Sequence, residues 1–114
     1  MKKIYYLKSC STCLRILKEI DKFEFRLQDI KSEPISLAQL EEMYSLTNSY
    51  EALFNRRSKK FSAMDLKNQV LTEREYKQLI LDEYTFLKRP VFIVDNKIFV
   101  GNAKKTIDLL KKLL

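Results

Sequence analysis

The segment KIYYLKSCSTCLRILKEI (residues 3–20) contains the only two cysteines of the chain, Cys10 and Cys13, separated by Ser11 and Thr12. Apolar and aromatic residues precede the pair, and apolar residues at helical spacing follow it, which predicts a buried strand, a loop and a helix. Two thiols at this spacing can form a disulfide together, bind a metal together or transfer electrons together. The rest of the sequence helps to decide among these three.

The composition is typical of one folded domain that comprises residues 1–114. Hydrophobic residues make up 46% of the chain, which has one glycine and two prolines, and this argues against disorder or low complexity. A chain of this length can form a single hydrophobic core. No apolar run approaches the length of a membrane span, and the N-terminal residues lack the features of a secretory signal. We therefore expect a cytoplasmic protein without a membrane segment, whose thiols are kept reduced.

The formal net charge is +7, and the 22 basic residues are interleaved with 15 acidic ones along the chain. Only residues 56–60, RRSKK, form a dense basic run, and such a run is usually a solvated surface. No helix-turn-helix, zinc-finger or RNA-binding motif accompanies this run, so no direct contact with nucleic acid is expected.

The chain has no histidine, which excludes Ser-His-Asp and Cys-His catalysis and every metal site with an imidazole ligand. A structural tetrahedral metal site needs four ligands, and two cysteines cannot supply an all-thiolate set. We therefore expect neither a metal nor a bound cofactor.

The first thirty residues predict a β–α–β unit. Residues 4–7 are typical of a buried strand, and residues 11–21 are typical of an amphipathic helix. Phe23, Phe25 and Leu27 then alternate with polar residues, which predicts a second strand with one buried face.

Residues 32–88 are expected to form a mostly helical insertion. Ser36 and Thr72 are each followed three residues later by glutamine or glutamate, as in the capping box that begins a helix. Shorter helical segments are expected within residues 49–54 and 61–68.

The end of the chain predicts two strands, at 91–94 and 97–100, and a final helix. The predicted apolar stripe of that helix consists of Ile107, Leu110, Leu113 and Leu114. The order βαβ, helical insertion, ββα is that of a thioredoxin-like α/β fold, with a four-stranded mixed sheet flanked by helices on both faces.

The strand–loop–helix interpretation gives the two cysteines different environments. Cys10 is expected at or just before the first helical turn, where free N–H groups and the helix dipole stabilise a thiolate and lower the pKa below about 8.5. Cys13 is expected to be more buried and placed to resolve a mixed disulfide on Cys10. The competing interpretation is that both cysteines are small hydrophobic residues of the core.

Arg89 and Pro90 precede the third predicted strand. In a thioredoxin-like fold this segment packs against the cysteine loop, and a proline here is commonly cis, which would leave backbone groups free to bind an extended partner chain. A guanidinium at about 4 Å from Cys10 would lower the thiol pKa by more than about one unit. The alternatives are a proline that begins a strand and a solvated arginine.

Several motifs resemble the arsenate reductase/Spx (ArsC-like) family over essentially the whole chain. They are KSCSTC (residues 8–13), SEPIS (32–36), FNRRSKKF (54–61) and KRPVFIVDNKIFVG (88–101), together with a helical insertion of the expected size. The RSK run (residues 57–59) and the SEP run (residues 32–34) resemble the Spx branch most closely.

Arsenate reductases of this family use one nucleophilic cysteine, several arginines that hold the oxyanion, and glutathione with glutaredoxin. The resemblance implies that Cys10 is the nucleophile and that Arg89 contacts the anion. Asn55 stands where those enzymes have a second arginine, and the segment KIFVG (residues 97–101) lacks their third arginine. Arg56 or Arg57 would have to replace these two arginines.

Spx proteins bind the C-terminal domain of the RNA polymerase α subunit, and a Cys-x-x-Cys disulfide regulates their transcriptional activity. By resemblance, Cys10 and Cys13 would form this switch close to Arg89. The polymerase-contacting loop of Spx has a glycine, whereas LTNSYEALF (residues 46–54) has none and is one residue shorter, and Spx has a further C-terminal segment.

Three hypotheses follow. The first is a thiol–disulfide oxidoreductase in which Cys10 attacks, Cys13 resolves and Arg89 lowers the Cys10 pKa or receives an anion. Its substrate groove would include Ser11, Thr12 and Pro90, and glutathione, glutaredoxin or thioredoxin would supply electrons. The second is an Spx-like regulator that binds the RNA polymerase α subunit, favoured by an exposed apolar and basic face at residues 47–51. The third is an arsenate reductase, which needs an arginine cluster beside Cys10.

Overall fold

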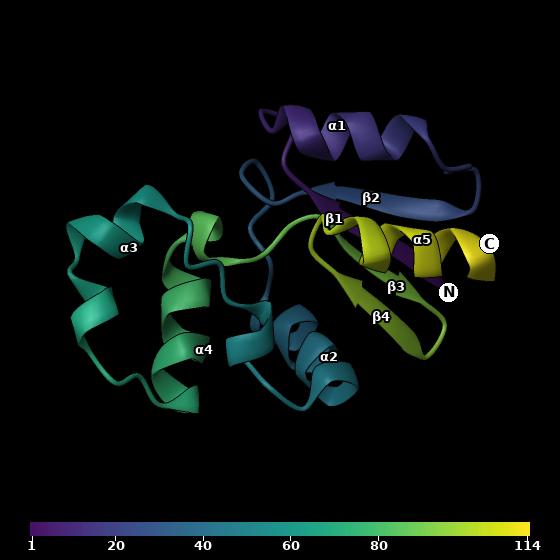
Figure 1. The fold of residues 1–114 in the computed structure, drawn as a ribbon. Coiled ribbons are helices and arrows are strands. Elements are labelled where there is room, and N and C mark those ends of the chain that lie inside the picture. The colour runs from purple at the N-terminus through teal and green to yellow at the C-terminus, as the bar shows by residue number, and fades with distance from the viewer. The chain divides into compact units, whose positions relative to one another are not determined.

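The computed structural model describes all residues 1–114 and divides them into two compact units. One unit combines Met1–Pro34 with Arg89–Leu114 and contains the β-sheet; we call it the sheet unit. The other, Ile35–Lys88, is helical and is called the helical unit; it nearly coincides with the predicted insertion at residues 32–88. Figure 1 shows the elements of both.

The sheet unit contains four strands in the order β2-β1-β3-β4. Strand β1 pairs in parallel with β2 and antiparallel with β3, and β3 forms an antiparallel hairpin with β4. The predicted four-stranded mixed sheet is therefore confirmed. Its elements are β1 (Lys2–Tyr6), α1 (Ser11–Lys18), β2 (Phe25–Asp29), β3 (Val91–Val94), β4 (Lys97–Val100) and α5 (Lys104–Leu113).

Helices α1 and α5 pack on the same hydrophobic core of the sheet unit. Alternating residues of β1, Ile4 and Tyr6, belong to this core, because successive side chains of a strand point to opposite faces. The other members are Cys13, Ile16, Leu17, Ile20, Phe25, Phe92, Val94, Ile107 and Leu110. The core thus fixes the position of α1, and with it the two cysteines.

Two predicted burial patterns are wrong at their ends. Phe23 is 90% exposed because it lies in the turn before β2, and Leu27 is 39% exposed because β2 is an edge strand with a neighbour on one side only. In the last helix, Ile107 and Leu110 are buried as predicted, whereas Leu113 and Leu114 are exposed. They lie in the last turn and at the end of α5, beyond the part of the helix that the core covers.

The helical unit begins its two longer helices as the sequence predicts. Ser36 accepts from the backbone N–H of Gln39, and Thr72 accepts from that of Glu75, and both capping boxes are complete. The two short predicted segments form 3₁₀ turns and a five-residue helix. The elements are α2 (Leu37–Thr47), η1 (Glu51–Leu53), α3 (Lys59–Ala63), η2 (Leu66–Asn68), α4 (Glu73–Asp82) and η3 (Tyr84–Phe86).

Aromatic side chains form the centre of the helical unit. The ring of Phe54 stacks on Phe86 with centroids 5.0 Å apart and contacts Tyr76 and Phe61 at 5.0 Å and 5.9 Å. Phe54, Phe86 and Tyr76 are buried. Such aromatic packing adds to the stability gained from burial alone. None of the helices, in either unit, has the length and hydrophobicity required to cross a membrane.

Neighbouring leucines in α5 provide a matched test of this core. Leu110 is completely buried and Leu109 is 50% exposed. We expect Leu110→Ala to lower the free energy of unfolding by about 2–5 kcal/mol, because it leaves a cavity. Leu109→Ala should change it by about 0.5 kcal/mol or less. Urea unfolding followed by circular dichroism would measure both, and equal effects would contradict the placement of α5.

Candidate functional site

Cys10 occupies the N-cap position of α1, directly after the loop that follows β1. Its backbone is extended, with φ −95° and ψ 110°, and its carbonyl oxygen accepts from the Leu14 N–H at 3.1 Å. Its own N–H donates to the Leu7 carbonyl at 3.0 Å, which fixes the loop. The predicted position of Cys10 at the start of the helix is therefore confirmed, and its thiol is half-buried.

Cys13 lies one turn further along α1 on the helix face that packs on the sheet. Its side chain is completely buried in the core of the sheet unit, and both cysteines are free thiols in this structure. Cys13 stands three residues after the N-cap residue Cys10, so it lies one helical turn further along. Its side chain points toward the sheet, whereas Cys10 stays near the surface.

The environment lowers the pKa of Cys10 below its ordinary value. Burial acts in the opposite direction and raises the pKa, but four stabilising interactions of the thiolate outweigh it. The backbone N–H and the thiol of Cys13 both donate to the Cys10 sulfur, the Arg89 charge attracts it, and the backbone N–H of Thr12 also contributes. The backbone N–H groups of Cys13 and Thr12 belong to the first turn of α1, where N–H groups have no partner within the helix and can stabilise an anion.

The same contact has the opposite effect on Cys13. Burial is the main cause that raises the pKa of Cys13 to about 11, and the hydrogen bond to Cys10 and its charge raise it further. A backbone hydrogen bond at Leu7 and the Arg89 charge only partly oppose this rise. At neutral pH Cys13 is therefore a thiol that donates to Cys10, and Cys10 is the better nucleophile of the two.

The peptide bond between Arg89 and Pro90 is cis, as we expected from the fold. Pro90 is buried, and its carbonyl oxygen accepts from the Gly101 N–H at 2.9 Å, which continues the β3–β4 ladder by one residue. The expectation that this segment leaves its backbone groups free is therefore wrong for the Pro90 carbonyl. Gly101 has φ 90°, a left-handed conformation that favours glycine.

The structure brings part of the predicted site together in the sheet unit. Cys10, Cys13 and Arg89 interact, Thr12 contributes a backbone hydrogen bond, and Ser11 is exposed in the first turn of α1. The structure contains no group of three or more histidine, cysteine, aspartate or glutamate side chains that could hold a metal ion.

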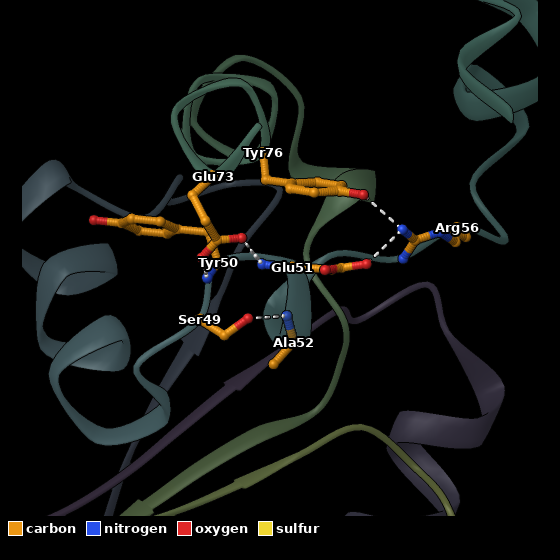
Figure 2. Close-up of polar contacts among 7 residues, drawn as sticks. All are labelled: Ser49, Tyr50, Glu51, Ala52, Arg56, Glu73 and Tyr76. Carbon is orange, nitrogen blue, oxygen red and sulfur yellow. Dashed lines mark hydrogen bonds and ion pairs between the residues drawn. The ribbon is translucent and has the colours of Figure 1, made fainter. Parts of the chain in front are cut away.

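Asn55, Arg56 and Arg57 lie in the helical unit, where two of their side chains are occupied by local contacts. The Asn55 amide donates to the Thr85 carbonyl at 3.0 Å, and its oxygen accepts from the Arg57 N–H at 3.1 Å. One Arg56 nitrogen pairs with Glu51 at 2.9 Å and donates to the Tyr76 hydroxyl at 2.6 Å. Figure 2 shows Arg56 directed toward these two partners. Arg56 is thus held within its own unit, and Arg57 is exposed.

The polar cluster in Figure 2 was missed from the sequence. The Glu73 carboxylate accepts from the backbone N–H groups of Tyr50 and Glu51 at 2.7 Å and 3.1 Å, and the Ser49 hydroxyl accepts from Ala52 at 3.0 Å. These bonds join the start of η1 to the start of α4. No local signal reveals them, because more than twenty residues separate Glu73 from the N–H groups it binds.

The model of the ArsC family matches residues 5–109 of the sequence. The chain belongs to the ArsC family. This ArsC-family chain is 28% identical over 104 residues to the global transcriptional regulator Spx 1 of Oceanobacillus iheyensis, covering 89% of the chain and 79% of that relative. It is 25% identical to the global transcriptional regulator Spx of Enterococcus faecalis over the same shares.

Solved structures confirm the fold of this ArsC-family chain. An ArsC family related protein from Bacteroides fragilis matches with a TM-score of 0.81 and 20% identity, over 99% of this chain and 97% of that one. An arsenate reductase from Vibrio cholerae matches with a TM-score of 0.79 and 12% identity, over the same shares. At these identities the likeness concerns the thioredoxin-like fold alone.

The opposite pKa shifts predict selective alkylation of one thiol. In the reduced ArsC-family protein, iodoacetamide should modify Cys10 first at neutral pH, because the lowered pKa gives it the larger thiolate fraction. The rate should rise with pH to a midpoint below that of free cysteine, while Cys13 should react only when the pH approaches 11 or the protein unfolds. Peptide mapping by mass spectrometry would assign each modified thiol.

Arg89→Ala removes one of the causes of the low Cys10 pKa and should therefore move that midpoint upward. Arg89→Lys should keep most of the shift because it keeps the charge. Arg26, an exposed arginine of β2, is the control, and Arg26→Ala should leave the midpoint unchanged. An unchanged midpoint in Arg89→Ala would remove Arg89 from the thiolate environment.

Proposed function

We propose that this chain is a thiol–disulfide oxidoreductase in which Cys10 attacks a disulfide and Cys13 resolves the product. One observation carries the proposal: Cys10 caps α1 half-buried, where its pKa is lowered, while Cys13 lies one turn further along in the core, where burial raises its pKa. Burial alone raises the pKa of a thiol, so two cysteines that served only for packing would both have raised pKa values.

The first step forms a mixed disulfide. The Cys10 thiolate attacks one sulfur of a partner disulfide, a bond forms between Cys10 and that sulfur, and the other partner sulfur leaves as a thiolate. Arg89 stabilises the attacking anion, and the loop that contains Ser11 and Thr12 would border the incoming chain together with Pro90. The number of disulfide bonds is unchanged in this step: the Cys10 sulfur is oxidised as the leaving partner sulfur is reduced.

The second step releases the reduced partner. Cys13 loses its proton and attacks the Cys10 sulfur, the Cys10–Cys13 disulfide forms, and the second partner sulfur leaves as a thiolate. In the mixed disulfide Cys10 has no charge, so two of the causes that raise the Cys13 pKa disappear. Cys13 therefore becomes easier to ionise only after the attack has taken place.

A reductant must return the disulfide to two thiols. Glutathione, glutaredoxin or thioredoxin would supply the two electrons and two protons, and each of them operates where thiols are kept reduced. The proposal thus includes a cytoplasmic location.

A second candidate is a redox-switched regulator, which the names of the curated relatives favour. Its partner would be the C-terminal domain of the RNA polymerase α subunit. The segment at residues 47–51 argues for the enzyme instead, since Tyr50 is buried, stacked on Tyr44 at 4.3 Å, and the exposed residues are Asn48 and Glu51. This is not the apolar and basic face that a regulator would need there.

Reduction of arsenate receives less support. Its anion would need several arginines beside Cys10, and Arg89 is the arginine of the sheet unit whose charge acts on Cys10. Asn55 is hydrogen-bonded to Thr85, and Arg56 is bound by Glu51 and Tyr76.

The attack and resolution steps are separated by single substitutions. Cys13→Ser should accumulate mixed disulfides on Cys10, because the attacking thiolate remains and the resolving thiol is absent. Cys10→Ser should accumulate none. Hydroxyethyl disulfide and oxidised glutathione are suitable substrates, and intact-mass spectrometry would detect the adducts. Equal adduct formation in both variants, or none in Cys13→Ser, would contradict the proposal.

Binding to the polymerase domain separates the two candidates. The enzyme should turn over disulfides with glutathione or thioredoxin and should not bind the isolated C-terminal domain of the polymerase α subunit. A regulator should bind that domain and bind differently after oxidation of Cys10 and Cys13, which calorimetry with reduced and oxidised protein would measure. Redox-dependent binding without turnover would overturn the enzymatic assignment.

A further inference from the structure

The positive charge of this protein belongs to one of its two units. The sheet unit contains fourteen lysines and arginines against seven aspartates and glutamates, whereas the helical unit contains eight of each. The whole formal net charge of +7 therefore lies in the unit that contains Cys10. Such an excess of one sign raises the rate at which oppositely charged partners arrive.

Much of this charge lies on helices α1 and α5. Lys111 of α5 contacts Glu19, directly after α1, at 2.5 Å, and Figure 1 shows the two helices running in the same direction. Six basic residues stand on the pair against two acidic ones. They are Arg15, Lys18, Lys104, Lys105, Lys111 and Lys112, against Glu19 and Asp108.

The two acidic residues are already neutralised by neighbours. Glu19 pairs with Lys111 and, more weakly, with Arg15 at 3.9 Å, and Asp108 pairs with Lys104 at 3.0 Å. Lys18, Lys105 and Lys112 are exposed and form no ion pair. These three charges are therefore available to a partner.

An exposed leucine lies among these charges. Leu109 of α5 is 50% exposed, and on the helical wheel it stands between Lys105 and Lys112, opposite the buried Ile107 and Leu110. We call Arg15, Lys18, Lys105, Leu109 and Lys112 the α1–α5 outer surface. Apolar residues inside a charged border are typical of protein interfaces, whereas a nucleic-acid backbone offers phosphates and no counterpart for leucine.

We propose that the α1–α5 outer surface docks an acidic protein segment whose apolar side chains pack on the exposed leucine of this surface. This segment carries the disulfide that Cys10 attacks. This inference rests on the proposed function and specifies its partner class. Helix α1 has eight residues and is thus about 12 Å long, which is close to the Debye length of about 10 Å at 0.1 M salt. Its basic residues consequently act on a partner that approaches the cysteine at its N-terminus.

The test uses two amphipathic peptides, each with one cysteine joined as a mixed disulfide to thionitrobenzoate. One peptide has glutamates and leucines, and the other has glutamines in place of the glutamates. In the Cys13→Ser protein, Cys10 attacks the peptide sulfur, the peptide becomes disulfide-bonded to Cys10, and thionitrobenzoate leaves as a coloured thiolate. The second-order rate constant is measured as a function of salt concentration.

We expect the acidic peptide to react at least about tenfold faster than the glutamine peptide at low salt, as steered association does. The advantage should disappear near about 1 M salt, where the Debye length is about 3 Å. In the Cys13→Ser background, the triple variant Lys18→Gln/Lys105→Gln/Lys112→Gln should lose most of the rate advantage of the acidic peptide. The matched control Lys59→Gln/Lys67→Gln/Arg74→Gln removes the same charge from exposed positions of the helical unit. This control should keep the rate advantage of the acidic peptide.

Hydroxyethyl disulfide, which is small and uncharged, should react equally with all of these variants. Slow reaction of Cys10 with this reagent would overturn the proposed function itself. Normal reaction with it and equal rates for both peptides would overturn only the docking surface. An equal loss in the two triple variants would assign the effect to net charge instead of to α1 and α5, and salt-dependent retention on duplex DNA without any peptide preference would assign the surface to nucleic acid.

Discussion

The opposite pKa shifts of Cys10 and Cys13 depend on where helix α1 lies on the sheet. They require a buried thiol and a half-buried thiol one helical turn apart. The packing of α1 on the sheet supplies both conditions, because Cys13 is a member of the core and Cys10 caps the helix. A change that moved α1 by a fraction of a turn would therefore alter both thiols at once, even without touching either sulfur.

The features that the sequence predicted well are local. Both capping boxes lie within four consecutive residues, and the β3–β4 hairpin lies within ten, so their signals do not depend on the rest of the fold. The position of Cys10 at the start of α1 follows from the same kind of signal. The buried face of β2 was not predictable in this way, since the exposure of Leu27 depends on β2 being the edge strand.

The surroundings of Arg56 were beyond sequence analysis for a related reason. Glu51 is only five residues away, but Tyr76 lies on α4, and the bond between Arg56 and Tyr76 exists only once the helical unit has folded. The sequence identified the basic run at 56–60 and left open whether it binds an anion. Its ion pair and its contact with the Tyr76 ring, 5.5 Å from the Arg56 carbon, give Arg56 a structural role instead.

The pKa values also bear on how long a Cys10–Cys13 disulfide would persist. Stabilising a thiolate stabilises the reduced form, and a disulfide whose reduced form is stabilised is a stronger oxidant. Each interaction that lowers the Cys10 pKa, including the Arg89 charge, therefore makes the oxidised state easier to reduce. A protein that stores an oxidising signal would gain from the opposite arrangement, with a thiol of ordinary acidity and a disulfide that resists the cellular reductants. The low Cys10 pKa accordingly fits a disulfide that cellular reductants reopen readily, and it limits the partners that the dithiol can reduce to those with strongly oxidising disulfides.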